Sequence, residues 1–143
     1  MALLDLLKKS PDQVQDKQVQ QLIAFAGGGK LIDDSDCSRE FRAFLGSVPF
    51  SNLKDYADQC LNQTFTDSGL ALQDIVNEIG ARLGSDVTPG RYRGTSKHLG
   101  FGGLWKYPNR NVSTRMRHFW AEFSVQLLGC IVLRSRLVDP HRL

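Results

Sequence analysis

The segment from 91 to 106 mixes basic and aromatic side chains, which are residue types that can contact nucleic acid. Its members of these two kinds are Arg91, Tyr92, Arg93, Lys97, Trp105 and Lys106. Lysine and arginine bind phosphates, and such binding weakens as salt rises because each contact releases counterions. The alternative is an exposed hairpin whose charges interact only with water. The sequence therefore predicts a candidate DNA-binding surface formed by the four basic residues, with that alternative left open.

Two other motifs fail the spacing that their chemistry needs. The Gly-Gly-Gly-Lys run at 27–30 is followed by Leu31, whereas a phosphate loop requires Ser or Thr there and a preceding strand. The acidic run of Asp33, Asp34 and Asp36 lacks the glycine and the final glutamate of a calcium loop. We interpret the glycines as a helix end and one of the aspartates as the cap of the next helix.

Cysteines and histidines are too scattered to predict a metal site. They are Cys37, Cys60, Cys130, His98, His118 and His141. No two cysteines form a C-x-x-C pair, and no histidine has a partner at metal-ligand spacing. This pattern favours neither a zinc site nor a disulfide framework, and it is typical of a reducing compartment.

The first sixty residues predict several short helices packed together. A capping-box start at Ser10 precedes an apolar pattern that continues to Phe25. Two further helices are expected, one with Phe41 on its apolar face and one capped by Ser51. We expect residues 1–62 to form a helical accessory region without a catalytic constellation.

The second half predicts a helix followed by a β-hairpin. Apolar residues fall on one helix face at Leu72, Ile75, Val76, Ile79 and Leu83. Two stretches rich in β-formers then follow, Asp86–Tyr92 and His98–Trp105, with a loop around Gly94 between them. The sequence therefore predicts an α+β fold that is mostly helical, with a helical bundle followed by a helix and a hairpin.

Four strings in this half together resemble the opening of PD-(D/E)XK, or restriction-endonuclease-like, nuclease domains. They are Ala71–Gly80, Arg82–Gly84, Gly90–Gly94 and Gly100–Trp105. In that family a helix carrying an acidic residue leads into a β-meander, whose second strand presents a metal-binding Asp and whose third presents an E-x-K triplet. The resemblance implies a partial nuclease-like core over residues 66–109.

The resemblance also implies metal-dependent phosphodiester hydrolysis, which needs carboxylate ligands and a nearby lysine. Glu78 would be the helix acid and a vestigial catalytic or metal-binding residue; the alternative is a solvated glutamate on a polar helix face. Gly102 stands at the expected position of the strand Asp, and no E-x-K follows Trp105. We therefore expect no intact catalytic site and no cofactor, with Mg²⁺ bound only if nuclease activity remains.

The tail, residues 110–143, differs in character from the rest of the chain. It holds six arginines and no lysine, against only Glu122 and Asp139. One interpretation is a native helix over about 113–133; the other is out-of-frame translation of a nuclease gene broken near codon 109. Neither interpretation supplies the missing catalytic residues.

Composition leaves several classes of function open. The net charge of only +3 is by itself no argument for nucleic acid. The start of the chain lacks the pattern of a signal peptide, and the most apolar stretch, Phe119–Leu133, is shorter than the ~20 residues of a membrane span. We expect a cytoplasmic protein outside the membrane.

The function expected from these observations is a truncated or remnant restriction-endonuclease-like protein, of the kind found on bacterial mobile elements. It would be catalytically inactive and would retain weak DNA binding. The alternative is a non-enzymatic helical module that binds a protein partner or nucleic acid. Its partners would then include DNA, another protein, or a second copy of the chain through the helical region.

Overall fold

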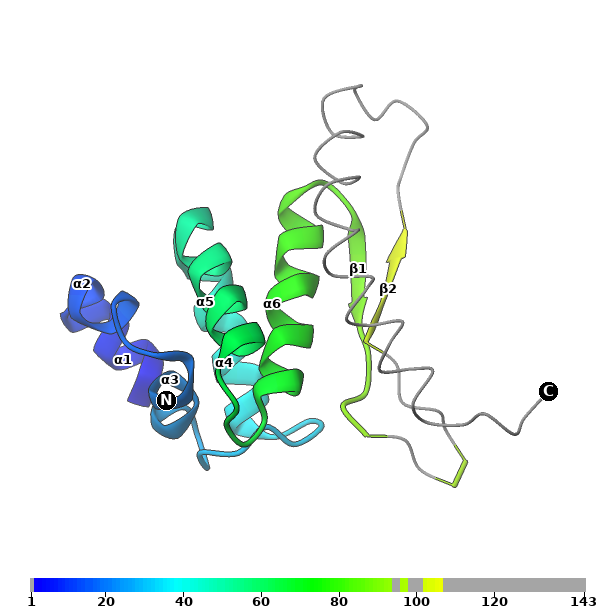
Figure 1. The fold of residues 1–143 in the computed structure, drawn as a ribbon, viewed down its shortest axis with the longest axis horizontal. Helices are drawn as coiled ribbons and strands as arrows, with labels where there is room; N and C mark the ends of the chain where they lie inside the picture. Colours follow the sequence, from blue (N-terminus) through cyan, green and yellow to red (C-terminus); the bar gives the residue numbers. More distant parts are fainter. Residues whose placement is uncertain (1, 94–95, 98–101, 107–143) are drawn as a thin grey trace. The chain divides into compact units, whose positions relative to one another are not determined.

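The fold is mostly helical, with one small antiparallel sheet. The computed structural model describes residues 2–93, 96–97 and 102–106 (Figure 1). Its elements are α1 (Ala2–Lys9), α2 (Pro11–Gln15), α3 (Val19–Phe25), α4 (Asp36–Ser47), α5 (Phe50–Asn62), α6 (Ser68–Arg82), β1 (Asp86–Pro89) and β2 (Gly103–Lys106). The mostly helical α+β class is confirmed. None of the helices in these ranges is long and apolar enough to cross a membrane. Both interpretations of the tail at 110–143 concern residues outside the described ones.

The core is built by large apolar side chains from successive helices. The largest fully buried ones include Leu3, Leu22, Phe41, Phe44, Leu45, Leu53, Tyr56, Ile75 and Ile79. The rings of Phe44 on α4 and Tyr56 on α5 lie 6.2 Å apart between centroids. Burying each such side chain contributes about 1.5–3 kcal/mol. This core holds α4, α5 and α6 together and so fixes the elements that carry the candidate site.

The helix predicted from Ser10 to Phe25 is in fact two helices, α2 and α3. Ser10 is the N-cap of α2, but its side chain makes no capping hydrogen bond. Val14 and Val19 are both buried, although five residues of unbroken helix would place them about 140° apart. A break at Gln18, whose backbone is extended, lets both side chains reach the core. Phe25 is exposed and does not join it.

Two predicted helix caps are also wrong. The N-cap of α4 is Ser35, whose hydroxyl accepts a hydrogen bond from the Ser38 amide at 3.2 Å. No aspartate caps this helix, because Asp33 and Asp34 lie in the preceding turn and Asp36 is the first residue of the helix itself. The helix α5 begins at Phe50 with Pro49 as its N-cap, so Ser51 lies inside the first turn.

The hairpin packs on one face of α6. β1 and β2 pair antiparallel with Val87 opposite Trp105. A Cβ added at Gly80 of α6 would lie 2.9 Å from ring carbons of Trp105, so only glycine allows this approach. Asn77 accepts a hydrogen bond from the Trp105 indole at 2.9 Å and donates one to the Gly102 carbonyl at 2.7 Å. The predicted helix and hairpin are therefore joined by specific contacts.

The strands are shorter than predicted. β1 stops at Pro89, which has no amide to donate to the ladder. The predicted end of that strand, Tyr92, instead donates its amide to Asp33. β2 starts at Gly103 and includes Lys106; residues 98–101 of the predicted second strand lie outside the described residues.

Candidate functional site

A buried ion pair joins α4 to α6 beside the hairpin. Arg42 Nε lies 3.0 Å from Asp74 Oδ1, and the side chains are 30% and 1% exposed. Tyr92, in the segment after β1, donates its hydroxyl hydrogen to the other oxygen of Asp74. The Arg42 guanidinium carbon also lies 5.0 Å from the centroid of the Tyr92 ring. These three residues form one connected network, called here the Arg42–Asp74–Tyr92 network.

Burial is the largest single influence on the pKa of each residue in this network. It raises the pKa of Asp74 above the ordinary value of 3.8, even though Tyr92 and Arg42 favour the charged carboxylate. Burial and the neighbouring Asp74 likewise raise the pKa of Tyr92. Burial, the largest single cause, would lower the pKa of Arg42, but Asp74 and Tyr92 together raise it and the net shift is upward. Tyr92 therefore remains protonated at neutral pH and acts as a donor to Asp74.

Glu78, the predicted helix acid, also has an arginine partner. Its Oε1 accepts a hydrogen bond from Arg82 Nε at 2.9 Å, one helical turn away. Arg82 in turn donates to the Leu45 carbonyl of α4 at 2.7 Å. Glu78 is thus neither fully solvated nor unpartnered; it belongs to a second, smaller network between α6 and α4.

A small cavity of about 120 Å³ lies between these two networks. Its lining residues come from α4, α6 and β1: Arg42, Leu45, Asp74, Asn77, Glu78, Ala81, Val87 and Pro89. The two carboxyl groups on this list are each bonded to an arginine. The cavity wall is more apolar than polar, and each of its two carboxylates is paired with an arginine.

Gly102 and Glu78 do not face the same part of α6. A Cβ added at Gly102 would lie 3.8 Å from Gln73 Cγ, whereas one added at Gly46 of α4 would lie 4.0 Å from the Glu78 carboxylate. Gln73 and Glu78 are five residues apart and so point about 140° from each other around the helix. A carboxylate at position 102 would begin beside Gln73. Among residues 2–93, 96–97 and 102–106, no three His, Cys, Asp or Glu side chains form a group that could hold a metal ion.

No protein-family model, no curated protein and no solved structure matches this chain. The resemblance to restriction-endonuclease-like domains therefore stays a prediction from the sequence strings alone. Gly94, Gly100 and Phe101 of these strings lie outside the described residues; the contacts of the others decide what can be proposed from them.

Three of the four predicted basic residues lie close together in sequence after β1. Arg91, Arg93 and Lys97 are all exposed, and we call them the basic loop. Lys106 is exposed too, but it lies opposite Asp86 in the register of the sheet, at the end of the hairpin away from Arg91. The structure therefore separates Lys106 from the basic loop and sets it beside an acid.

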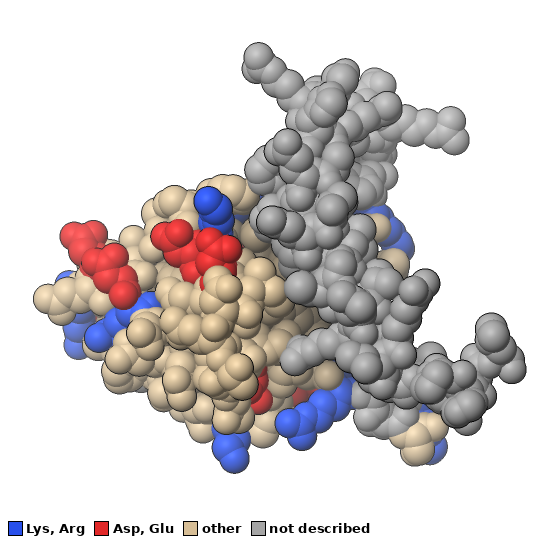
Figure 2. Space-filling model, in the orientation of Figure 1, with Lys and Arg blue, Asp and Glu red and all other residues tan. Residues whose placement is uncertain are grey.

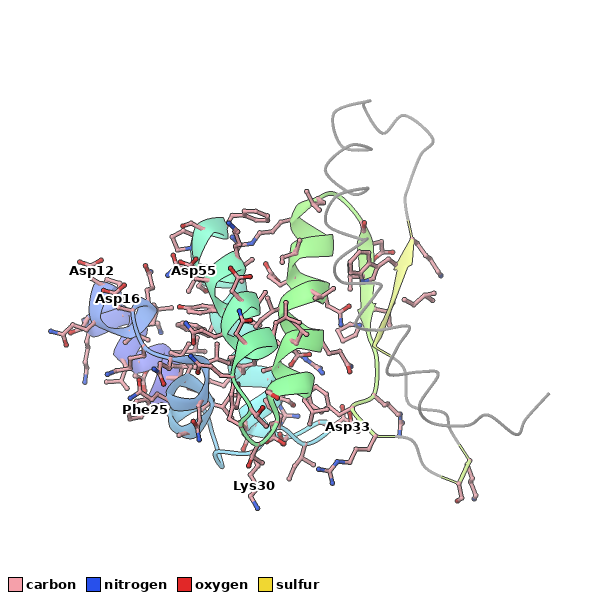
Figure 3. The ribbon with its side chains drawn as sticks, viewed as in Figure 1. Asp12, Asp16, Phe25, Lys30, Asp33 and Asp55 are labelled. Carbon is pink, nitrogen blue, oxygen red and sulfur yellow. The ribbon has the colours of Figure 1, made fainter. Side chains whose placement is uncertain are left out.

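The backbone of the basic loop is held by Asp33. Its carboxylate accepts hydrogen bonds from the Tyr92 amide at 2.8 Å and, more weakly, from the Arg93 amide at 3.4 Å. Figure 3 shows Asp33, from the segment before α4, beside the chain that leaves β1. Residue 92 is thus fixed at both ends, by Asp33 at its amide and by Asp74 at its hydroxyl.

Acidic side chains gather elsewhere on the molecule. Figure 2 shows them over α2 and α5, where Asp12, Asp16 and Asp55 are labelled in Figure 3. All three are exposed. Figure 2 also shows Lys and Arg side chains beside these acids, so this face carries charges of both signs.

Sequence reasoning missed Arg42, Asp74 and Asp33. No local signal marked Asp74, because it lies about 160° around the helix from Leu72, opposite the predicted apolar face, and its burial is known only from the structure. An acid on a buried helix face requires a partner. Nothing in the sequence identifies that partner as Arg42, which is 32 positions away.

Proposed function

We propose that this chain is a catalytically inactive, restriction-endonuclease-like protein that binds DNA weakly through the basic loop. The observation that carries the proposal is the exposure of Arg91, Arg93 and Lys97 after β1, with the backbone of Tyr92 and Arg93 held by Asp33. Exposed basic side chains on a held backbone suit contact with regularly spaced phosphates. We propose DNA as the ligand because the sequence around the basic loop resembles a family of DNA nucleases.

The two aromatic residues of the segment, Tyr92 and Trp105, are engaged in contacts within the protein, so we do not propose that they stack on bases. The Tyr92 hydroxyl is bonded to buried Asp74, and its ring lies against Arg42. Trp105 packs on Gly80 and bonds to Asn77. Stacking on bases needs an available ring face. Binding by the basic loop should therefore involve phosphates and have little sequence preference.

Loss of catalysis is supported by the partners of the acids on α6. A nuclease metal needs ionised carboxylates directed at a common point. Asp74 is bonded to Arg42 and Tyr92, and Glu78 is bonded to Arg82. Recruiting either as a ligand would break an existing ion pair and leave an arginine without its partner.

We expect purified protein to bind a short DNA duplex with an affinity that falls steeply with salt. If the three residues of the basic loop each contact one phosphate, affinity should fall about 40-fold between about 50 mM and about 200 mM salt. Replacing both Arg91 and Arg93 with alanine should reduce that fall to about fourfold, since one contact remains. Fluorescence anisotropy with a labelled duplex of arbitrary sequence measures both quantities.

The matched control replaces Lys8 and Lys9, two exposed residues of α1, with alanine. This variant loses the same charge from a different element and should keep the salt dependence of the unmodified protein. The proposal is wrong if no binding is seen at either salt concentration. It is equally wrong if the α1 variant weakens binding as much as the loop variant does.

We further expect no cleavage of plasmid or oligonucleotide DNA with Mg²⁺ or Mn²⁺. Gly102→Asp alone should also be inactive, because the added carboxylate would begin beside Gln73, away from Glu78. Gel assays over long incubations check both proteins. Metal-dependent cutting by the unmodified chain that disappears in Glu78→Ala would show that an active site exists and that its acid is Glu78.

A further inference from the structure

Asp33 is a negatively charged residue placed against the basic loop. Its carboxylate bonds to the amides of two consecutive loop residues, Tyr92 and Arg93. For a surface that binds phosphates, a carboxylate at this place is electrostatically unfavourable. Its contribution must therefore be geometric if it favours binding.

The contacts of residue 92 indicate what that geometric contribution is. Asp33 holds its amide, while Asp74 and Arg42 hold its side chain from the α6 and α4 side. The neighbours on either side, Arg91 and Arg93, are exposed. With the central residue fixed in this way, the two arginines leave the backbone in set directions, which lowers the ordering cost of binding.

We propose that Asp33 is a positioning residue for DNA binding, which orients Arg91 and Arg93 toward phosphates by fixing the backbone between them. This inference rests on the proposed function. It assigns a role to a residue 58 to 60 positions away in sequence from the loop that it orients.

The proposal predicts that Asp33→Ala lowers the affinity for DNA, whereas the loss of a negative charge by itself would raise it. Asp33→Ala removes a negative charge near the DNA, so charge alone would raise affinity. If Asp33 positions the loop, affinity at low salt should instead fall about tenfold, and the salt slope should shrink by up to about 1.8, the contribution of two phosphate contacts. Anisotropy titrations over a series of salt concentrations give both values.

Asp34→Asn is the matched control for charge. Asp34 is adjacent and exposed, and its carbonyl, not its carboxylate, accepts the hydrogen bond from Arg39. Its φ of 58° lies in the left-handed region, which asparagine tolerates well. This variant loses the same charge without losing the anchor, so its affinity should stay equal or rise slightly.

A double-mutant cycle separates positioning from a general loss of structure. In a protein that already carries Arg91→Ala and Arg93→Ala, Asp33→Ala should no longer weaken binding, since there is nothing left to orient. Circular dichroism confirms that each variant is folded at the assay temperature. An equal loss in both backgrounds, or a rise in affinity for Asp33→Ala alone, overturns the positioning role.

The same titrations distinguish this inference from the proposed function. If replacing Arg91 and Arg93 leaves affinity unchanged, the basic loop is not the binding surface and the proposed function fails. If that replacement weakens binding while Asp33→Ala behaves like Asp34→Asn, the proposed function stands and only the role of Asp33 is refuted.

Discussion

Replacing Arg42 with methionine should lower the free energy of unfolding by about 3–5 kcal/mol, the usual cost of removing one partner of a buried ion pair. Asp74 is 1% exposed in its side chain, so without Arg42 its charge would have no nearby compensation except the Tyr92 hydroxyl. Methionine keeps most of the volume of the arginine stem, which limits the loss of packing. Urea unfolding followed by circular dichroism measures the difference.

Arg39→Met provides the control on the same helix. Arg39 also pairs with an aspartate, Asp36, but the two side chains are 64% and 82% exposed. An exposed pair of this kind contributes at most about 0.5 kcal/mol. Equal losses for the two variants would mean that the Arg42–Asp74 pair is no more important than a surface contact.

The cost of Arg42→Met should depend on pH in a defined direction. Folding raises the pKa of Asp74, so its ionisation removes stability as pH rises through the folded pKa. Without Arg42 the pKa should rise further, because a positive neighbour that favours the charge is gone. The variant should therefore be closest to the unmodified protein in mild acid, where Asp74 can hold a proton. A gap in stability between the two proteins that does not narrow as pH falls would contradict this account.

The elements that could be predicted are those decided by local pattern. Helix α6 was predicted because Ile75 and Ile79 recur at helical spacing, and the hairpin because β-formers alternate with glycine and proline. The break between α2 and α3 was not predicted, since the apolar pattern alone does not show that Val14 and Val19 pack into one core. Ser35 was passed over for an aspartate because a carboxylate and a hydroxyl cap equally well. Asp33 and Asp34 lie in the turn that the Ser35 amide closes on the Ile32 carbonyl, and this turn leaves Ser35 as the residue that precedes the helix.

The candidate site was predicted less completely because it is made by contacts between distant segments. Arg91 and Arg93 could be identified by type and spacing. Asp33 and Arg42, which hold the segment that carries them, come from the helical half and have no local signature. Gly80 shows the same limit, since only the position of Trp105 explains why a glycine occurs within a long helix.

A second large effect is expected for Glu40, a buried residue of α4 that is 5% exposed. Its two carboxylate oxygens accept hydrogen bonds from the Leu4 amide of α1 at 3.1 Å and the Gly27 amide after α3 at 2.8 Å. Glu40 thus fastens two N-terminal segments to the central helix. Glu40→Ala should cost about 3–6 kcal/mol, because each hydrogen bond to a charged acceptor contributes about 1.5–3 kcal/mol.

Glu78→Ala is the control for this prediction. Glu78 is also a helical glutamate, but its bond is to Arg82 on the same helix and both side chains are partly exposed. Its removal should cost no more than about 1 kcal/mol. A loss of that size for Glu40→Ala would mean that water replaces the carboxylate at both amides.

Glu40→Gln tests whether the charge itself contributes. Burial raises the pKa of Glu40, but hydrogen bonds that favour its charged form, including those from Gly27 and Leu4, bring it below the ordinary value of 4.5. A lowered pKa gives stability that is present above 4.5 and lost as pH falls through the folded pKa. The unmodified protein should therefore exceed the glutamine variant most at neutral pH, and the difference should shrink between about pH 5 and about pH 2. Urea unfolding of both proteins across that range measures it, and a difference that grows in acid would show that folding raises this pKa.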